Sequence, residues 1–145
     1  MKALTICQPY PALILLPTSD PRHKRVENRT WPTNYRGPMY MHAGKSRQWL
    51  DLSDDGTRDE AYDLPLSSMP FGAVVATMDL IDCLRIERIR SGEYDSKYPW
   101  LREHVHASGP WCWVLDNIKP CGPHPWRGAQ GLFDIDPVEL ARGAA

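Results

Sequence analysis

Frequent prolines limit what this chain can fold into. The 145 residues include fourteen prolines and ten glycines. A proline inside a helix removes a backbone hydrogen bond and clashes with the preceding turn, so few stretches between these breaks can hold a long helix. The pattern excludes a helical bundle and favours short strands joined by turns.

The longest strand-forming stretch, residues 71–81, starts as an apolar run and then alternates, with Met78 and Leu80 set against Thr77 and Asp79. We expect further strands at Ala3–Cys7, Gly37–Ala43, Trp111–Asp116 and Gly131–Ile135. We expect short helices at Pro11–Leu16, Ser46–Leu52 and Tyr98–His104. Together these elements predict an α+β chain that is mainly β, a small barrel decorated by short helices.

The length fits a single domain over residues 1–145. Residues 51–68, polar and rich in Asp and Ser, predict a mobile insertion, and residues 141–145 a frayed tail. No apolar run approaches the ~20 residues of a membrane helix. The four cysteines are scattered without regular spacing, which is typical of reduced thiols. We therefore expect a cytoplasmic protein with no membrane association, and nothing in the sequence implies an obligate protein partner.

The charge is unevenly distributed along the chain. Residues 1–50 hold three Lys and five Arg against two acidic residues, whereas the remaining part holds nine basic and sixteen acidic residues. A compact basic stretch in a mildly acidic protein indicates an anionic ligand, with phosphate as the first candidate. The alternative is a solvated, Arg-rich loop. The stretch comprises Arg22, Lys24, Arg25, Arg29, Arg36, Lys45 and Arg47, which we expect to form one positive face.

Several motifs, taken in order, resemble an ASCH domain. They are residues 3–11, with Gln8-Pro9 at their centre, then Lys24–Trp31, Tyr35–Pro38, His42-Ala43, Gly72–Val75 with Asp79, Ser108–Trp111 and Gly128–Phe133. Lys24, Glu27 and Arg29 match the family pattern G-x-K-x-x-E-x-R, with Arg22 in place of the glycine. Cys7 replaces the frequent Arg, and Tyr10-Pro11 replaces Trp-Ala.

This resemblance implies a PUA-like β-barrel that binds RNA or a modified nucleobase. It also implies an alternative, because a subgroup of ASCH-like proteins removes the acetyl group from N4-acetylcytidine with a Lys, Thr and Glu constellation. Here Lys24 matches the Lys, Glu27 replaces the Thr, and Asp79 falls where the Glu is expected. These three residues form the candidate catalytic set. A ribonuclease is a third possibility, although no His pair is placed for it.

The basic stretch also makes sense as a ligand cradle. In an extended segment Glu27, Arg29 and Trp31 share a face. Cations there can neutralise a phosphate, Glu27 can accept from an exocyclic amine, and an aromatic ring can stack on a base. The alternative is an ion pair of Glu27 with Arg29 or Arg36 that only orders the barrel mouth. The candidate binding residues are Gln8, Tyr10, Arg29, Trp31, Arg36, Trp126 and Arg127.

Other chemistry finds less support in the sequence. Trp111 and Trp113 alternate on an expected strand and are interpreted as core, and Trp49 as a helix residue packed on the barrel. Cys121 and His124 have a ligand-like spacing but lack the second half of a zinc site, so we expect no metal. No P-loop or nucleophile elbow is present, and no cofactor is implied. The sequence favours binding of RNA or a modified nucleoside over hydrolysis.

Overall fold

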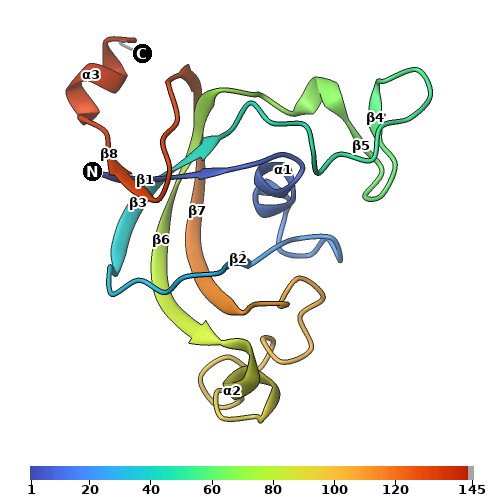
Figure 1. The fold of residues 1–145 in the computed structure, drawn as a ribbon, viewed down its shortest axis with the longest axis vertical. Helices are drawn as coiled ribbons and strands as arrows, with labels where there is room; N and C mark the ends of the chain where they lie inside the picture. The colour runs from blue at the N-terminus through green and yellow to red at the C-terminus, as the bar shows by residue number, and fades with distance from the viewer. Residues whose placement is uncertain (144–145) are drawn as a thin grey trace.

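A curled sheet with short helices at its ends makes up the computed structural model, which describes residues 1–143 (Figure 1). The strands are β1 (Lys2–Ile6), β2 (Val26–Arg29), β3 (Gly37–Ala43), β4 (Arg58–Asp59), β5 (Leu64–Pro65), β6 (Ala73–Arg85), β7 (Trp111–Pro125) and β8 (Leu132–Asp134). The helices are α1 (Tyr10–Leu15), α2 (Ile86–Arg90) and α3 (Pro137–Ala141), and residues Leu66–Ser68 form one 3₁₀ turn. No helix of the described chain is long and apolar enough to cross a membrane.

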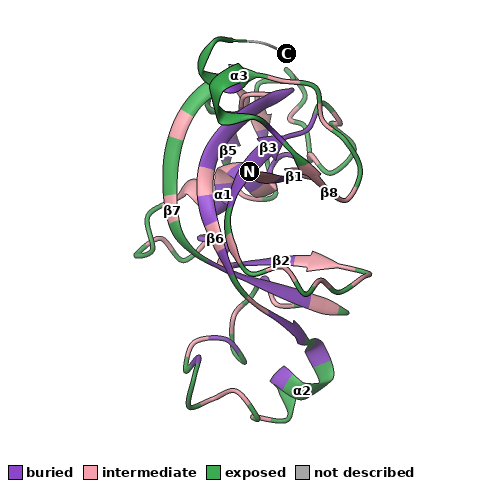
Figure 2. Cartoon of the chain, turned by 90° about the vertical axis from the view of Figure 1, so that its left-hand side faces the viewer, coloured by how far each residue is buried: buried purple, intermediate pink, exposed green. Residues whose placement is uncertain are grey.

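The main sheet has six strands in the order β2-β7-β6-β3-β1-β8. Strands β1 and β3 are parallel, and the other neighbours are antiparallel. The long strands β6 and β7 pair with three register shifts, and such bulges bend and twist a sheet. The sheet therefore curls into a half-barrel rather than a closed barrel, since the described residues show no pairing between its edges β2 and β8. Figure 2 shows buried residues along β3 and β6 and exposed ones along the far half of β7.

The expected strands are confirmed, with longer bounds for two of them. Strand β6 continues to Arg85 and β7 to Pro125, well past the expected ends. The alternation in β6 is as predicted, because Met78 and Leu80 are buried whereas Thr77 and Asp79 are partly exposed. The pair β4 and β5 was not expected, since strands of two residues carry no periodic signal.

Two expected helices are wrong. Residues 98–104 form successive turns, in which Leu101 N–H donates to the Tyr98 carbonyl and His104 N–H to the Leu101 carbonyl. Pro99 disfavours a helical conformation for the residue before it. Residues 46–52 form a single turn, and Trp49 is 56% exposed rather than packed on the sheet.

The expected mobile insertion, residues 51–68, contains the β4–β5 hairpin. The carboxylate of the fully buried Asp59 accepts hydrogen bonds from the backbone N–H groups of Asp51 and Tyr62, which closes the hairpin base. Its mobility stays a prediction. Of the expected frayed tail, Ala141 ends α3, and residues 144–145 lie outside the described residues.

Trp113 on β7 is the largest fully buried side chain of the core inside the curl. Its indole N–H donates to the carbonyl of Trp31 at 3.3 Å, and the two rings meet edge to face with centroids 4.8 Å apart. This contact fixes the segment after β2 against the core. The interpretation of Trp113 as core is confirmed, whereas Trp111 is only partly buried against it.

We predict opposite outcomes for truncating two tryptophans. Trp113→Ala should lower the free energy of unfolding by about 3–5 kcal/mol, because it leaves a large cavity in the core. Trp49→Ala should change it by less than about 0.5 kcal/mol, because that ring is mostly solvated. Urea unfolding curves of both variants provide the check. Equal losses would contradict this assignment of core and surface.

Candidate functional site

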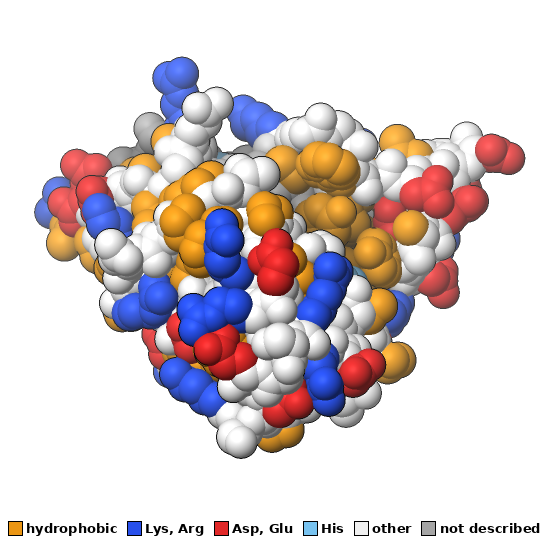
Figure 3. All heavy atoms as spheres, turned by 60° about the horizontal axis from the view of Figure 1, so that its bottom comes forward, with side chains coloured by type: hydrophobic (Ala, Val, Ile, Leu, Met, Phe, Trp, Pro, Cys, Tyr) orange, Lys and Arg blue, Asp and Glu red, His pale blue; other side chains and the backbone are white. Residues whose placement is uncertain are grey.

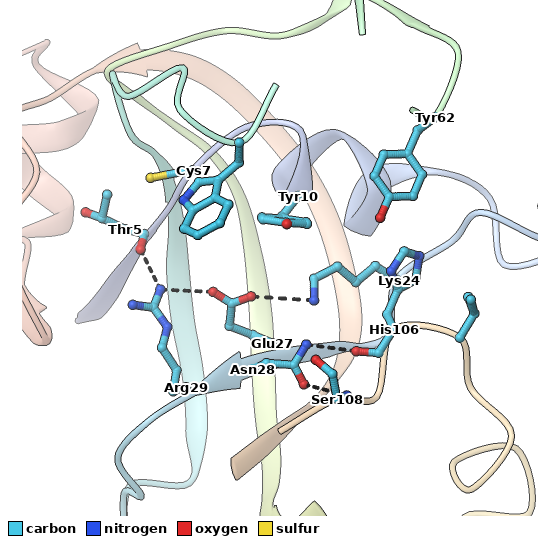
Figure 4. A pocket seen from close by; sticks show the side chains of 12 residues that line it. Thr5, Cys7, Tyr10, Lys24, Glu27, Asn28, Arg29, Tyr62, His106 and Ser108 are labelled. Atoms are coloured by element: carbon cyan, nitrogen blue, oxygen red, sulfur yellow. Dashed lines mark hydrogen bonds and ion pairs between the residues drawn. The ribbon is translucent and has the colours of Figure 1, made fainter. Parts of the chain in front are cut away.

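A pocket of about 430 Å³ lies on the open side of the half-barrel (Figure 4). The end of β1, helix α1, strand β2, the β4–β5 hairpin and the loop before β7 each contribute to its wall. Its size is typical of small-molecule sites. The lining residues are Thr5, Cys7, Tyr10, Lys24, Glu27, Asn28, Arg29, Trp49, Tyr62, Val105, His106 and Ser108.

A row of three charges forms one wall of the pocket. The Glu27 carboxylate lies between Lys24, whose Nζ is 3.6 Å from Oε1, and Arg29, whose Nη2 is 3.0 Å from Oε2. Arg29 Nη2 also donates to the Thr5 carbonyl of β1 at 2.6 Å. Glu27 and Arg29 share a face because they are two residues apart on β2. The row therefore connects strand β2 to β1 across the open side of the sheet.

Lys24 carries a buried ammonium group that has no close hydrogen-bond acceptor among the described residues. The residue is 2% exposed, and its backbone N–H donates to the Leu13 carbonyl of α1. Its contact with Glu27 is longer than a normal hydrogen bond, and its Nζ lies 5.2 Å from the Tyr10 ring centroid. Burial lowers the pKa of Lys24, and the nearby Glu27 carboxylate opposes that effect. Figure 4 shows the ammonium directed into the pocket, where a ligand acceptor can reach it.

Asn28 positions the loop that forms the opposite wall. Its side-chain N–H donates to the His106 carbonyl at 2.8 Å, and its Oδ1 accepts from the backbone N–H groups of Ser108 and Gly109 at 3.1 and 2.8 Å. The Cys112 thiol is a further donor to Oδ1. One side chain on β2 thus fixes the shape of residues 106–109.

Two histidines of this loop are held neutral. His106 Nε2 lies 2.9 Å from the Arg22 carbonyl, so this nitrogen carries the proton and Nδ1 keeps its lone pair. His104 Nε2 instead accepts from the backbone N–H of Arg25 at 3.1 Å. Burial lowers the pKa of His106, and it lowers the pKa of His104 to about 4. Of the two, only His106 lines the pocket.

Three aromatic side chains and a thiol complete the pocket. Tyr10 comes from α1, Tyr62 from the hairpin and Trp49 from the segment after β3. The Tyr62 ring lies 5.8 Å from that of His106, centroid to centroid. Burial raises the pKa of the Cys7 thiol, which therefore stays protonated and is not poised as a nucleophile. The aromatic surfaces are suited to a planar ligand.

The structure brings four of the sequence-predicted residues to the pocket, namely Tyr10, Lys24, Glu27 and Arg29. It does not bring Asp79 there, and the expected constellation of Asp79 with Lys24 and Glu27 is therefore not formed. Asp79 lies on the face of β6 opposite to the buried Met78 and Leu80, and its carboxylate accepts from the Asn117 side chain. Strand alternation explains this, because a neighbour of two core residues points away from the core.

The other expected binding residues lie outside the pocket. Gln8 is 1% exposed, and its amide bonds to the Pro70 carbonyl and the Ala12 N–H. Trp31 packs on Trp113, and Arg36 pairs with Asp82 at 3.7 Å. The remaining two are Trp126, which packs on a separate cluster around Ala3 and Val74, and Arg127, which is exposed beyond it.

Most cations of the basic stretch are engaged by contacts within the fold. Arg22 pairs with Asp20 at 2.9 Å, Lys24 and Arg29 share Glu27, and Arg36 pairs with Asp82. Arg25 and Arg47 lie over the rings of Trp100 and Phe71. Figure 3 accordingly shows basic and acidic side chains interspersed. Four of the seven cations thus pair with acidic residues within the fold, whereas Arg25 and Arg47 keep their charge and pack on aromatic rings.

Several pocket residues were missed by sequence reasoning. Asn28 lies inside the Lys24–Trp31 motif. Because strand alternation places it on the face opposite to Glu27 and Arg29, there was no reason in the sequence to choose it as a site residue. Trp49 was assigned to packing. Thr5, Cys7 and Ser108 also stand inside the motifs but were not chosen as site residues. Tyr62, Val105 and His106 lie outside the motifs and carry no local signal. Within residues 1–143 no group of three His, Cys, Asp or Glu side chains is arranged to hold a metal ion.

Removing the Asn28 side chain should loosen the pocket wall. Asn28→Ala should lower the free energy of unfolding by about 1–3 kcal/mol, because the N–H groups of Ser108 and Gly109 lose their acceptor. Hydrogen exchange at these two amides should become faster. Asn34→Ala, at an exposed position, is the matched control. Unchanged exchange in Asn28→Ala would contradict the anchoring role.

His104 should make the fold sensitive to acid. Its folded pKa of about 4 lies below the ordinary value, so between pH 6.5 and about 4 the unfolded chain binds a proton that the folded chain does not. Stability should fall as the pH drops through this window, by at most about 1.4 kcal/mol per pH unit for this group. His104→Gln should reduce that slope in thermal unfolding measured from pH 7 to 4.5. An identical slope in the variant would show that His104 does not contribute.

A scan against family models matches none of them, and a search of curated proteins returns no match. The assignment of function accordingly depends on the geometry of the pocket and on the residues of the sequence motifs.

Proposed function

We propose that this protein binds a modified nucleobase, free or within RNA, in the pocket lined by Lys24 and Glu27. The observation that carries the proposal is the buried Lys24 ammonium, which opens into an aromatic-lined cavity without a close acceptor. Burying an ammonium group without full hydrogen bonding is costly, so a site that keeps one gains from a ligand that supplies an acceptor.

The pocket offers complementary groups to the edge of a base. Lys24 Nζ donates to a ring nitrogen or a carbonyl oxygen, and the Glu27 carboxylate accepts from an exocyclic amine or a ring N–H. The Tyr10 ring, beside Lys24, provides a face for stacking, typically worth about 1–3 kcal/mol per base. Base-edge contacts of this kind select one base among several.

The motif residues support a family proposal as well. Lys24, Glu27 and Arg29, which match the ASCH pattern, are the residues that form the charged row. The curled, mainly β sheet supports a PUA-like fold in its strand content and curvature, although over residues 1–143 the sheet is not closed into a barrel. We propose on these grounds that the chain is an ASCH domain of the PUA-like superfamily.

A second candidate is hydrolysis of an N4-acylated cytidine, favoured by a carboxylate and an ammonium group that lie 3.6 Å apart in the pocket. Glu27 would take a proton from water as the water oxygen bonds to the acyl carbon, and Lys24 would stabilise the resulting oxyanion. The C–N bond then breaks, and the proton passes from Glu27 to the leaving amine. Glu27 replaces Asp79 as the carboxylate of this scheme. A ribonuclease is less favoured, because the pocket lining includes one histidine.

Replacing Lys24 should separate binding from stability. Lys24→Met keeps the volume of the side chain but removes the ammonium, so nucleoside affinity should fall about ten- to a hundred-fold, the value of one charged hydrogen bond. Stability should stay unchanged or rise, because the cost of burying the charge disappears. Calorimetric titration with a panel of free nucleosides, acylated cytidines and short RNAs, alongside thermal unfolding, measures both quantities.

Two further variants complete this test. Glu27→Gln should lower both affinity and stability, because Lys24 and Arg29 then face each other without a carboxylate. Lys119→Met, at an exposed position, should change neither. If Lys24→Met destabilises the fold and binding is normal, the charged row is a scaffold and the proposal is wrong. Mass spectrometry of the same mixtures detects loss of an acyl group, which would establish the hydrolase.

A further inference from the structure

The outer wall of the pocket carries a charge opposite to that of its interior. Inside, Lys24 and Arg29 oppose the single carboxylate of Glu27, so the lining has an excess of positive charge. Outside, residues 51–63 of the hairpin carry six acidic residues and one basic residue. Exposed among the acidic residues are Asp51, Asp54, Asp55, Glu60 and Asp63. Figure 3 shows acidic side chains gathered at the right-hand end, where Figure 1 places the hairpin.

Direct contacts hold this acidic hairpin at the mouth of the pocket. Tyr62 lines the pocket, and Arg22 Nη1 donates to the carbonyls of Tyr62 and Asp63 at 2.8 and 3.2 Å. The Arg22 carbonyl in turn accepts from His106 on the opposite wall. The carboxylate of the buried Asp59 also accepts a hydrogen bond from the backbone N–H of Tyr62. Glu60 and Asp63 lie within two residues of Tyr62, and Asp51 lies two residues from Trp49, so these three acidic residues are close in the chain to side chains that line the pocket.

Three arginines around the pocket are already paired with carboxylates. Arg22 makes two contacts with the Asp20 carboxylate, at 2.9 and 3.1 Å. Arg58 is paired with Asp63, and Arg29 with Glu27. These three arginines could offset the charge of an arriving phosphate only by giving up the carboxylates with which they are paired.

Two apolar side chains at the rim of the pocket also disfavour a phosphate. Trp49 is 56% exposed and Val105 is 75% exposed, and both line the pocket. Exposed apolar groups at a cavity mouth favour an uncharged, partly apolar segment of the ligand over a charged one. These two side chains offer no partner to a phosphate, whereas a ribose carries no charge that would need one.

Building on the function proposed above, we infer that the acidic hairpin acts as an electrostatic filter, so that the site takes uncharged nucleobases or nucleosides and rejects their phosphorylated forms and RNA strands. The inner cations attract the oxygen acceptors of the base, and the outer carboxylates repel a phosphate attached to the sugar. Selection thus comes from a repulsive element as well as from attractive contacts.

The test compares each nucleoside that binds with its own 5′-monophosphate and with a short RNA containing it. We expect the monophosphate to bind about five-fold or more weakly in 20 mM salt, and the difference to shrink in 500 mM salt as the repulsion is screened. The variant Asp51→Asn/Asp54→Asn/Glu60→Gln removes three hairpin charges that make no side-chain hydrogen bonds among the described contacts. It should narrow the difference without changing nucleoside affinity.

Matched neutralisation elsewhere serves as the control. Glu87→Gln/Asp116→Asn/Glu139→Gln removes three exposed charges from α2, β7 and α3, and should leave the ratio of the two affinities unchanged. A monophosphate or RNA that binds as tightly as the nucleoside in low salt would overturn the filter while leaving the proposed function standing. Failure of every nucleoside, nucleotide and RNA to bind would overturn both.

Discussion

The Glu27 carboxylate between Lys24 and Arg29 is the interaction on which the rest of the site depends. The sheet is open between its edge strands β2 and β8, and the end of β1 extends past its pairing with β8. Arg29 crosses this gap to the Thr5 carbonyl of β1 while it pairs with Glu27. The same carboxylate is the nearest partner of the buried Lys24 ammonium. Strand β2 is an edge strand whose backbone groups would otherwise be exposed, and here it forms one wall of the pocket. The Glu27 carboxylate therefore serves both the stability of the pocket wall and the proposed recognition of a base.

The site combines a well-packed support with an under-satisfied centre. Behind β2, Trp113 and Trp31 fix the strand to the core, and Asn28 fixes the loop opposite. These contacts hold Lys24 in a place where its charge is costly and its pKa is lowered. Such a combination is expected of a pre-organised binding site. The packing around Lys24 offsets the unfavourable free energy of burying its ammonium group, which gains a full hydrogen-bond partner only when a ligand binds.

Sequence patterns predicted correctly those parts of the fold that depend on strand alternation. The alternation of Met78 and Leu80 with Thr77 and Asp79 located β6, and the spacing of Glu27 and Arg29 placed both on one face. The same alternation, applied strictly, would have excluded Asp79 from the pocket. Trp49 was misassigned because it was placed in the expected helix at residues 46–52, which does not form, and its ring is instead solvated at the cavity mouth. His106 and Tyr62 reach the pocket through long-range contacts with Arg22, which no local pattern encodes.

The most direct measurement of the central claim is the pKa of Lys24, followed by NMR of ¹⁵N-labelled lysine side chains with and without a bound nucleoside. Burial, only partly offset by the Glu27 carboxylate 3.6 Å away, predicts a pKa below the ordinary lysine value in the free protein. A nucleoside that offers an acceptor to Nζ should raise it, since a hydrogen bond to the charged form favours that form. A pKa at or above the ordinary value in the free protein, unmoved by any nucleoside, would contradict the account.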